Sequence, residues 1–198
     1  LRPAYRCDGT ASNQVSDSRH WVVAVSECGA SAIAVFLGPS LPREAATALL
    51  AAQYLPPAQF GDVYRLIGSG VRAIVLIDGV FHGRAPVWQR ELLCALGSGI
   101  RVYGAASMGA LRAAELDRYG MVGLGTVYTW YASGELDGDD EVALLHAGPE
   151  QGHRPLSLPL VNVRGTLSAA VARGLITQES AVAMIAHLKM LPFWERTA

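Results

Sequence analysis

The fold is decided by the stretch RAIVLI at residues 72–77, which stops at the turn signal Asp78-Gly79. A short run of mostly branched apolar residues bounded by such a turn is typical of a strand that is buried on both faces. Two further runs of this kind lie on either side of it in the sequence, SAIAVFL at 31–37 and IRVY at 100–103. We therefore predict three buried strands.

Helical patterns separate these strands and follow the last one. Strands that are apolar without alternation need cover on both faces, and helices between successive strands supply it. The sequence thus predicts an α/β fold in which a mainly parallel sheet carries helices on both faces. The helical patterns cover residues 42–52, 61–68, 86–96 and 107–119.

The last third of the chain has a different pattern. Residues 124–133 are predicted to be helical. The segments DDEVALLH at 139–146 and LPLVNVR at 158–164 predict an added β element, a pair of strands. Two further helices, over 165–173 and 177–190, form a helical C-terminus.

Length and composition bound the class of protein. The 198 residues suffice for one domain with a real core, expected over 31–198 after a polar, poorly defined extension at 1–30. With 51% hydrophobic and 17% charged residues, the chain is not of the disordered class. A net charge of −1 excludes the basic surface typical of proteins that bind nucleic acid or anionic membranes. No apolar run approaches the roughly 18 to 20 residues of a membrane span.

The cysteines and acidic residues give no metal site. Three cysteines that lack metal-ligand spacing and form no even set favour a reducing cytoplasm. The acidic cluster at 137–141 lacks the spacing of a calcium loop, so a solvated turn is the favoured interpretation. Arg112 and Glu115 stand three residues apart on one predicted helix and are expected to pair.

A serine stands in the turn GAASMG at 104–109, between a predicted strand and a predicted helix. Small residues around Ser107 permit a sharp turn that presents its hydroxyl at the helix N-terminus, as in a nucleophile elbow. The spacing here is Ala-x-Ser-x-Gly rather than Gly-x-Ser-x-Gly. The alternative is that Ser107 caps the helix, which is the commoner task of a serine at this position.

A nucleophilic serine needs a base, and the sequence offers two candidates. Lys189 is the single lysine among the 16 basic residues, and helical periodicity places it on a stripe with Val182 and Ile185. It is either a base with a pKa lowered by burial or a side chain that extends to the surface. Among the histidines, His146 is the best placed alternative.

Together these motifs resemble the TfuA family, proteins that accompany YcaO enzymes in peptide backbone thioamidation. The resemblance runs from Phe36 to Arg196, and its most specific part is the segment 103–146. Its markers are FLGPSL at 36–41, LPPAQFGDV at 55–63, LIDGVF at 76–81, VWQREL at 87–92, YGAASMGALRAAEL at 103–116, YGMVGLG at 119–125, DDEVALLH at 139–146 and PLVNVR at 159–164.

The resemblance implies a hydrolase that acts on a thiocarboxylated sulfur carrier of the ubiquitin-like ThiS type and supplies sulfide to YcaO. It implies a serine and lysine pair, which maps onto Ser107 and Lys189. The protein itself is expected to need no cofactor, because ATP is used by the YcaO partner. Two alternatives remain open: a non-catalytic adaptor that binds YcaO and promotes its affinity for the peptide, and a hydrolase of small esters.

Further residues are expected to take supporting roles in that reaction. The backbone N–H of Met108 would stabilise the oxyanion, helped by Gly79 or Val80 from the neighbouring loop. Asp78 is a candidate for positioning Lys189 or the carrier tail. The anionic end of the tail would be held by Arg112 or Arg164.

Overall fold

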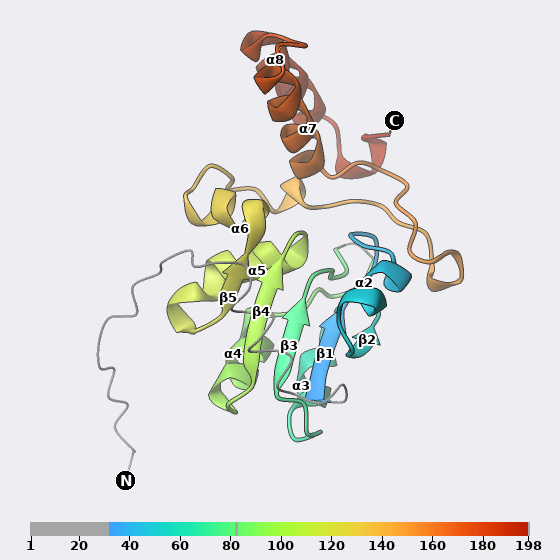
Figure 1. Ribbon diagram of the computed structural model, residues 1–198, viewed down its shortest axis with the longest axis vertical. Coiled ribbons are helices and arrows are strands. Elements are labelled where there is room, and N and C mark those ends of the chain that lie inside the picture. The colour runs from blue at the N-terminus through green and yellow to red at the C-terminus, as the bar shows by residue number, and fades with distance from the viewer. Residues whose placement is uncertain (1–31, 82, 198) are drawn as a thin grey trace.

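The computed structural model describes residues 32–81 and 83–197 (Figure 1). The extension predicted over residues 1–30 lies outside this range. The described chain contains a five-stranded sheet that is parallel throughout, with the strand order β2-β1-β3-β4-β5. This confirms the predicted α/β class. The strands are β1 (Ile33–Phe36), β2 (Gln53–Leu55), β3 (Ala73–Leu76), β4 (Arg101–Ala105) and β5 (Val122–Leu124).

Helices cover both faces of the sheet, as predicted. Along β1, Ile33 and Val35 pack with Ala46 of helix α2 on one face, whereas Ala34 and Phe36 join a larger core on the other face. The division follows from the right-handed crossover rule, because the chain reverses its direction across the sheet after β2. The larger core is covered by α3 (Asp62–Leu66), α4 (Gln89–Gly97) and α5 (Met108–Leu116), while α2 spans Arg43–Leu49.

The two edge strands are absent from the sequence prediction. Strands β2 and β5 have three residues each, QYL and VGL, and neither forms an apolar run. Strand β5 continues directly into helix α6 (Gly125–Ala132), which packs on α5 and contributes Tyr131 to the larger core. Short edge strands of this kind are fixed by their neighbours rather than by their own sequence.

The predicted β element at 139–146 and 158–164 is wrong. The first segment begins as the 3₁₀ helix η3 (Asp139–Glu141) and then runs extended, with a single bridge between His146 and Pro155. The second is mostly the start of helix α7 (Leu160–Ala172), which begins after Pro159 and buries Leu160. A short apolar run fits a strand or a buried helical turn equally well, and here Pro159 favours the helix start.

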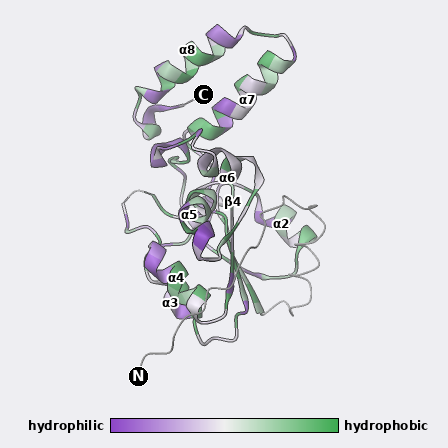
Figure 2. Cartoon of the chain, turned by 90° about the vertical axis from the view of Figure 1, so that its left-hand side faces the viewer, coloured by the Kyte–Doolittle hydropathy of each residue, from purple (hydrophilic) through white to green (hydrophobic). Residues whose placement is uncertain are grey.

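The C-terminal helices form an arm that stands off the sheet. Helix α7 lies against α8 (Gln178–Lys189), and the two helices extend beyond the rest of the chain in both views (Figures 1 and 2). The predicted helical C-terminus is thus confirmed, although α7 begins earlier than expected. The remaining short elements are η2 (Asp117–Tyr119), η4 (Pro149–Gln151) and η5 (Phe193–Glu195).

The turn that carries Ser107 depends on one close approach. The backbone N–H of Gly109, in the first turn of α5, donates to the carbonyl oxygen of Ile77 at 3.0 Å. A Cβ on Gly109 would overlap the carbonyl oxygen of Leu76. Helix α5 can therefore approach the end of β3 only because residue 109 is glycine.

Replacement of Gly109 by alanine is expected to destabilise the protein by about 1–3 kcal/mol, because helix and strand must separate to admit the methyl group. The matched control is Gly97→Ala, since a Cβ at Gly97, which also lies in a helix, would meet nothing within 4 Å. Denaturant unfolding of both variants measures the difference. Equal stabilities would contradict this account of the turn.

Candidate active site

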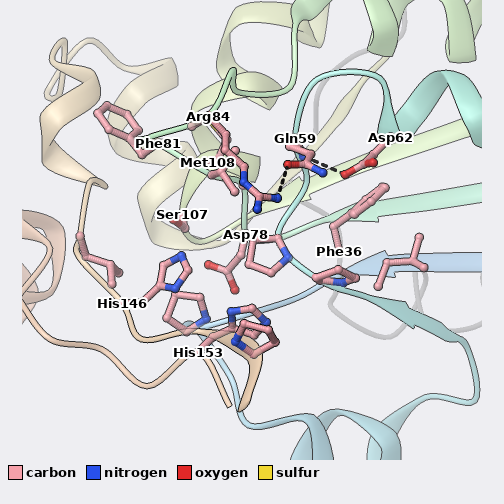
Figure 3. A pocket seen from close by; sticks show the side chains of 18 of the residues that line it. Phe36, Gln59, Asp62, Asp78, Phe81, Arg84, Ser107, Met108, His146 and His153 are labelled. Atoms are coloured by element: carbon pink, nitrogen blue, oxygen red, sulfur yellow. Dashed lines mark hydrogen bonds between the residues drawn. The ribbon is translucent and has the colours of Figure 1, made fainter. Parts of the chain in front are cut away.

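A cavity of about 750 Å³ opens at the carboxyl ends of the strands (Figure 3). One wall comes from the loops that follow β1, β2, β3 and β4, and the opposite wall from the segment 142–153. The strand order reverses at β1 and β3, and parallel sheets bind ligands in the crevice at such a point. The cavity therefore lies where this architecture places ligand sites.

Ser107 lines this cavity from the turn between β4 and α5. The residue before it, Ala106, has a φ of 59°, a left-handed conformation that costs energy for a residue with a side chain. Ser107 is the N-cap residue of α5, yet its side chain makes no capping hydrogen bond. The hydroxyl is thus presented to the cavity as expected for a nucleophile elbow, rather than used as a cap.

The predicted oxyanion donors lie next to Ser107. Met108 is the first residue of α5, so its N–H has no acceptor within the helix. Gly79 lies directly against it, since a Cβ on Gly79 would be 2.8 Å from Cγ of Met108. Both residues line the cavity. Val80, the alternative to Gly79, also lines it, but its N–H already donates to the carbonyl oxygen of Ala58 at 2.9 Å and is not available to an oxyanion. The structure thus brings the two predicted loops together at one place.

Asp78 is almost completely buried beneath the cavity. Its carboxyl oxygens accept hydrogen bonds from the backbone N–H groups of Gly38 (2.8 Å) and Ser40 (3.1 Å) and from the Ser40 hydroxyl (2.6 Å). Burial raises the pKa of Asp78 above its ordinary value, and these hydrogen bonds offset only part of the increase. Asp78 therefore ties the loop after β1 to the end of β3.

His146, the alternative base, lines the cavity from the opposite wall. Its Nδ1 lies 2.8 Å from the carbonyl oxygen of Ala147. A carbonyl oxygen can only accept a hydrogen bond, so Nδ1 carries a proton, and in the neutral imidazole Nε2 is the nitrogen with the lone pair. Figure 3 shows the imidazole in the same cavity as the Ser107 side chain, and its charge acts on the Asp78 carboxyl group. This is the tautomer that a general base requires.

Two cavity residues were missed by sequence reasoning. The ring of His153 contacts that of His146, with centroids 5.3 Å apart. The guanidinium of Arg84 points into the cavity and donates to Oε1 of Gln59 at 3.1 Å (Figure 3). No motif surrounds either residue, and both come from loops, so no periodicity could have indicated them.

Three predicted residues lie away from this cavity. Lys189 is not desolvated on α8: its side chain is 43% exposed, and its Nζ donates to Oε1 of Glu141 at 3.0 Å. Arg164 binds both carboxyl oxygens of Glu141 at 2.8 Å. Arg112 donates to both oxygens of Glu115, which confirms that predicted pair, and to the carbonyl oxygen of Val87. None of the three lines the cavity.

Glu141 corrects the interpretation of the acidic cluster as a solvated turn. The residue is fully buried. Burial alone would raise the pKa of Glu141, but the hydrogen bonds from Arg164 and Lys189 hold it below its ordinary value. Asp140 next to it binds the buried guanidinium of Arg196 at 2.6 Å. The acidic turn thus receives the basic side chains of the C-terminal arm.

Comparison with known proteins places the chain in a family. A family model described as TfuA-like protein matches residues 78–197, from the buried aspartate to the end of the arm. The chain belongs to the TfuA-like family. This family is associated with YcaO-dependent thioamidation. The resemblance seen in the sequence is confirmed over this range, and the part before Asp78 lies outside the match. A search among curated proteins found no match.

Two further observations on this TfuA-like chain concern metal binding and membrane insertion. Within residues 32–81 and 83–197, no three His, Cys, Asp or Glu side chains are grouped so that they could hold a metal ion. In the same part of the chain, every helix is too short or too polar to cross a lipid bilayer.

Variants of Lys189 distinguish an ion pair from a catalytic base. Arginine can replace the ammonium group beside Glu141 but cannot serve as a base. If the protein releases sulfide from a thiocarboxylated carrier, as the family resemblance implies, we expect Lys189→Arg to do so at the wild-type rate. Lys189→Met is expected to lower the free energy of unfolding by roughly 1 kcal/mol, because a hydrogen bond to a buried carboxylate is lost. If Lys189→Arg abolishes release while its stability is unchanged, Lys189 is the base after all.

Proposed function

We propose that this protein hydrolyses the C-terminal thiocarboxylate of a small ubiquitin-like sulfur carrier and supplies the sulfide to a YcaO enzyme. Ser107 is the nucleophile and His146 is its base. The observation that carries the proposal is the uncapped Ser107 hydroxyl, which shares one cavity with a histidine whose Nε2 is free to accept a proton. The TfuA-like family membership supports the thioamidation context.

The first half of the reaction transfers the acyl group to the enzyme. Nε2 of His146 accepts the proton of Ser107 while Oγ attacks the thioacyl carbon. The carbon–sulfur bond then breaks, and the sulfur leaves as hydrosulfide with the proton that His146 had accepted. An ester between the carrier tail and Ser107 remains.

The second half restores the enzyme. His146 takes a proton from a water molecule, and the resulting hydroxide attacks the ester carbonyl. Ser107 leaves with the proton from His146, and the carrier departs as a carboxylate after it loses a proton to solvent. In both halves the oxyanion forms next to the Met108 N–H at the positive end of helix α5, with Gly79 close by.

The charge of the substrate makes a cation necessary. A thiocarboxylate is anionic at neutral pH, and its negative charge opposes attack by a nucleophile. Arg84 reaches the cavity and has only the neutral Gln59 as its hydrogen-bond partner among the described residues. It takes the role that the sequence suggested for Arg112 or Arg164, both of which are bound to carboxylates elsewhere.

The shape of the cavity suits the flexible end of a polypeptide. Phe36, Leu55, Phe81 and a pair of prolines, Pro56 and Pro57, supply apolar lining near the polar groups. A narrow tail without bulky side chains can reach Ser107 between such walls. The proposed reaction requires no cofactor in this protein, since ATP is used by the YcaO partner, and we place it in the cytoplasm.

Ser107→Ala is expected to reduce sulfide release from a thiocarboxylated carrier by at least about 10³-fold, because the nucleophile is absent. The measurement is sulfide production under single-turnover conditions, with Ser98→Ala, a serine of the α4 C-cap, as the control. A wild-type rate in Ser107→Ala would refute the hydrolase proposal. Thermal unfolding checks that both variants fold.

Arg84→Gln is expected to weaken binding of a carrier-tail peptide with a free C-terminal carboxylate by about tenfold, because a charged hydrogen bond is lost. The matched control is Arg65→Gln, since Arg65 also lines the cavity but already pairs with Asp62. Fluorescence anisotropy with carboxylate and carboxamide peptides measures both variants. If Arg84→Gln still discriminates between the two peptides as the wild type does, another group binds the anion.

A non-catalytic adaptor is the second candidate function, and the arm favours it. Helices α7 and α8 and their connections, which extend beyond the sheet (Figure 2), expose Leu175, Val182, Met184 and Met190. Exposed apolar side chains gathered on one element can serve as a partner contact. Under the adaptor hypothesis, Ser107→Ala retains full thioamidation when free sulfide is supplied to YcaO. The two functions can coexist in one chain.

A further inference from the structure

His153 occupies a strained position in the wall of the cavity. It follows Gly152, and both residues have positive φ, 62° and 56°. Among the residues that the structure describes, only His153 and Ala106 combine a side chain with such a conformation. Ala106 directly precedes Ser107, so the two strained positions lie on opposite walls of the same site. Strain of this kind persists where the surroundings enforce it, and it clusters at functional sites.

The imidazole of His153 carries a second unfavourable feature. Its Nδ1 is buried without a hydrogen-bond partner, and no other side-chain nitrogen or oxygen in the described part of the chain shares this condition. An unpaired buried polar atom is destabilising, and a phenyl ring would not carry that cost. Histidine adopts positive φ more readily than most residues with a side chain, but the local packing gives its Nδ1 no partner.

The ring of His153 contacts the ring of His146 and can restrict its orientation. The two rings meet edge to face at an interplanar angle of 73°. On its other side, His146 is held by the hydrogen bond from Nδ1 to the carbonyl oxygen of Ala147. The backbone of Ala147 is in turn fixed by its N–H, which donates to the carbonyl oxygen of Arg154 at 2.9 Å. The ring of His146 is therefore confined by a backbone acceptor and by the ring of His153.

The charges around His153 allow it to remain neutral while His146 is protonated. Burial lowers the pKa of His153, and a positive charge on His146 lowers it further. The negative groups that face it, Asp78 and Glu150, act in the opposite direction but more weakly. A neutral neighbour spares the protonated His146 a second positive charge.

We propose that His153 is a positioning residue of the Ser107 site, whose imidazole holds the ring of His146 with Nε2 toward the Ser107 hydroxyl. The inference rests on the proposed role of His146 as base. This role also accounts for both unfavourable features. A ring that must reach His146 from this loop requires the positive φ of His153, and it lies where Nδ1 finds no partner.

Two variants separate the ring from the backbone and from the nitrogen. His153→Gly removes the ring and relieves the strain, because glycine adopts positive φ freely. His153→Phe keeps the ring and removes the unpaired nitrogen. The exposed histidine of α8 provides the control, His187→Ala. Each full-length variant is assayed for kcat and KM of sulfide release, for thermal unfolding, and for the His146 tautomer by ¹⁵N NMR of the imidazole nitrogens.

In His153→Gly we expect kcat to fall by about 10- to 100-fold through misplacement of the base, with KM nearly unchanged. The His146 signals should then change from a single Nδ1–H tautomer to a mixture. In His153→Phe, kcat should stay within about threefold of wild type and the melting temperature should rise, because ring packing is kept and the unpaired atom is gone. His187→Ala should match the wild type throughout.

An unchanged kcat and an unchanged His146 tautomer in His153→Gly would overturn the proposal. Equal losses of kcat in both variants with an intact His146 tautomer would also overturn it, because the nitrogen would then act directly. If the wild-type protein releases no sulfide, the proposed function fails, and the tautomer in His153→Gly decides alone whether His153 orients His146.

Discussion

The buried carboxyl group of Asp78 is the constraint on which the cavity depends. A carboxyl group removed from water must be hydrogen-bonded, and the loop after β1 supplies the donors from Gly38 and Ser40. The loop after β1 is therefore held over the end of β3, and the cavity stays open beside this loop. Because the donors are neutral, they do not cancel the effect of burial, and the pKa of Asp78 stays raised. A positive charge on His146 acts in the same direction as these donors and lowers the pKa of Asp78.

Glu141, which directly precedes the opposite wall, is a second buried carboxyl group, and its hydrogen-bond donors are of a different kind. Its carboxylate is as well buried as that of Asp78, but its donors, Arg164 and Lys189, are cations. The pKa of Glu141 is consequently lowered where that of Asp78 is raised. The contrast fits the two places: a fixed charge anchors the C-terminal arm, whereas a carboxyl group with neutral partners stands in the cavity. The single lysine of the chain, Lys189, is one of the cations that bind Glu141.

The sequence predicted what short-range patterns determine. The run RAIVLI identifies β3. The small residues around Ser107 predict a sharp turn, and one of them, Gly109, lets helix α5 approach the end of β3. The predictions failed where distant partners decide. The segment 158–164 was assigned to a strand because an apolar run leaves helix and strand undistinguished, and Pro159 alone marks the helix start. Lys189 lies 48 residues from Glu141 in the sequence, so no helical periodicity could indicate that pair. His153 lacked any signal, since its backbone conformation and its contact with His146 arise only in the folded loop.

The C-terminal arm makes contacts on both sides of the cavity. Glu141 and Asp140, which bind the cations of the arm, immediately precede the segment 142–153 that carries His146. Phe193, after α8, meets Phe81 of the opposite wall edge to face with the ring centroids 5.7 Å apart. The arm therefore contacts the wall that contains Phe81 through an aromatic pair. Through ion pairs it contacts the two residues that precede the other wall. Because Ser107 and His146 stand on different walls, the distance between them depends on the position of the arm. Apolar contacts alone would let the arm shift along the surface that it contacts, whereas the directional hydrogen bonds to Glu141 and Asp140 fix its position.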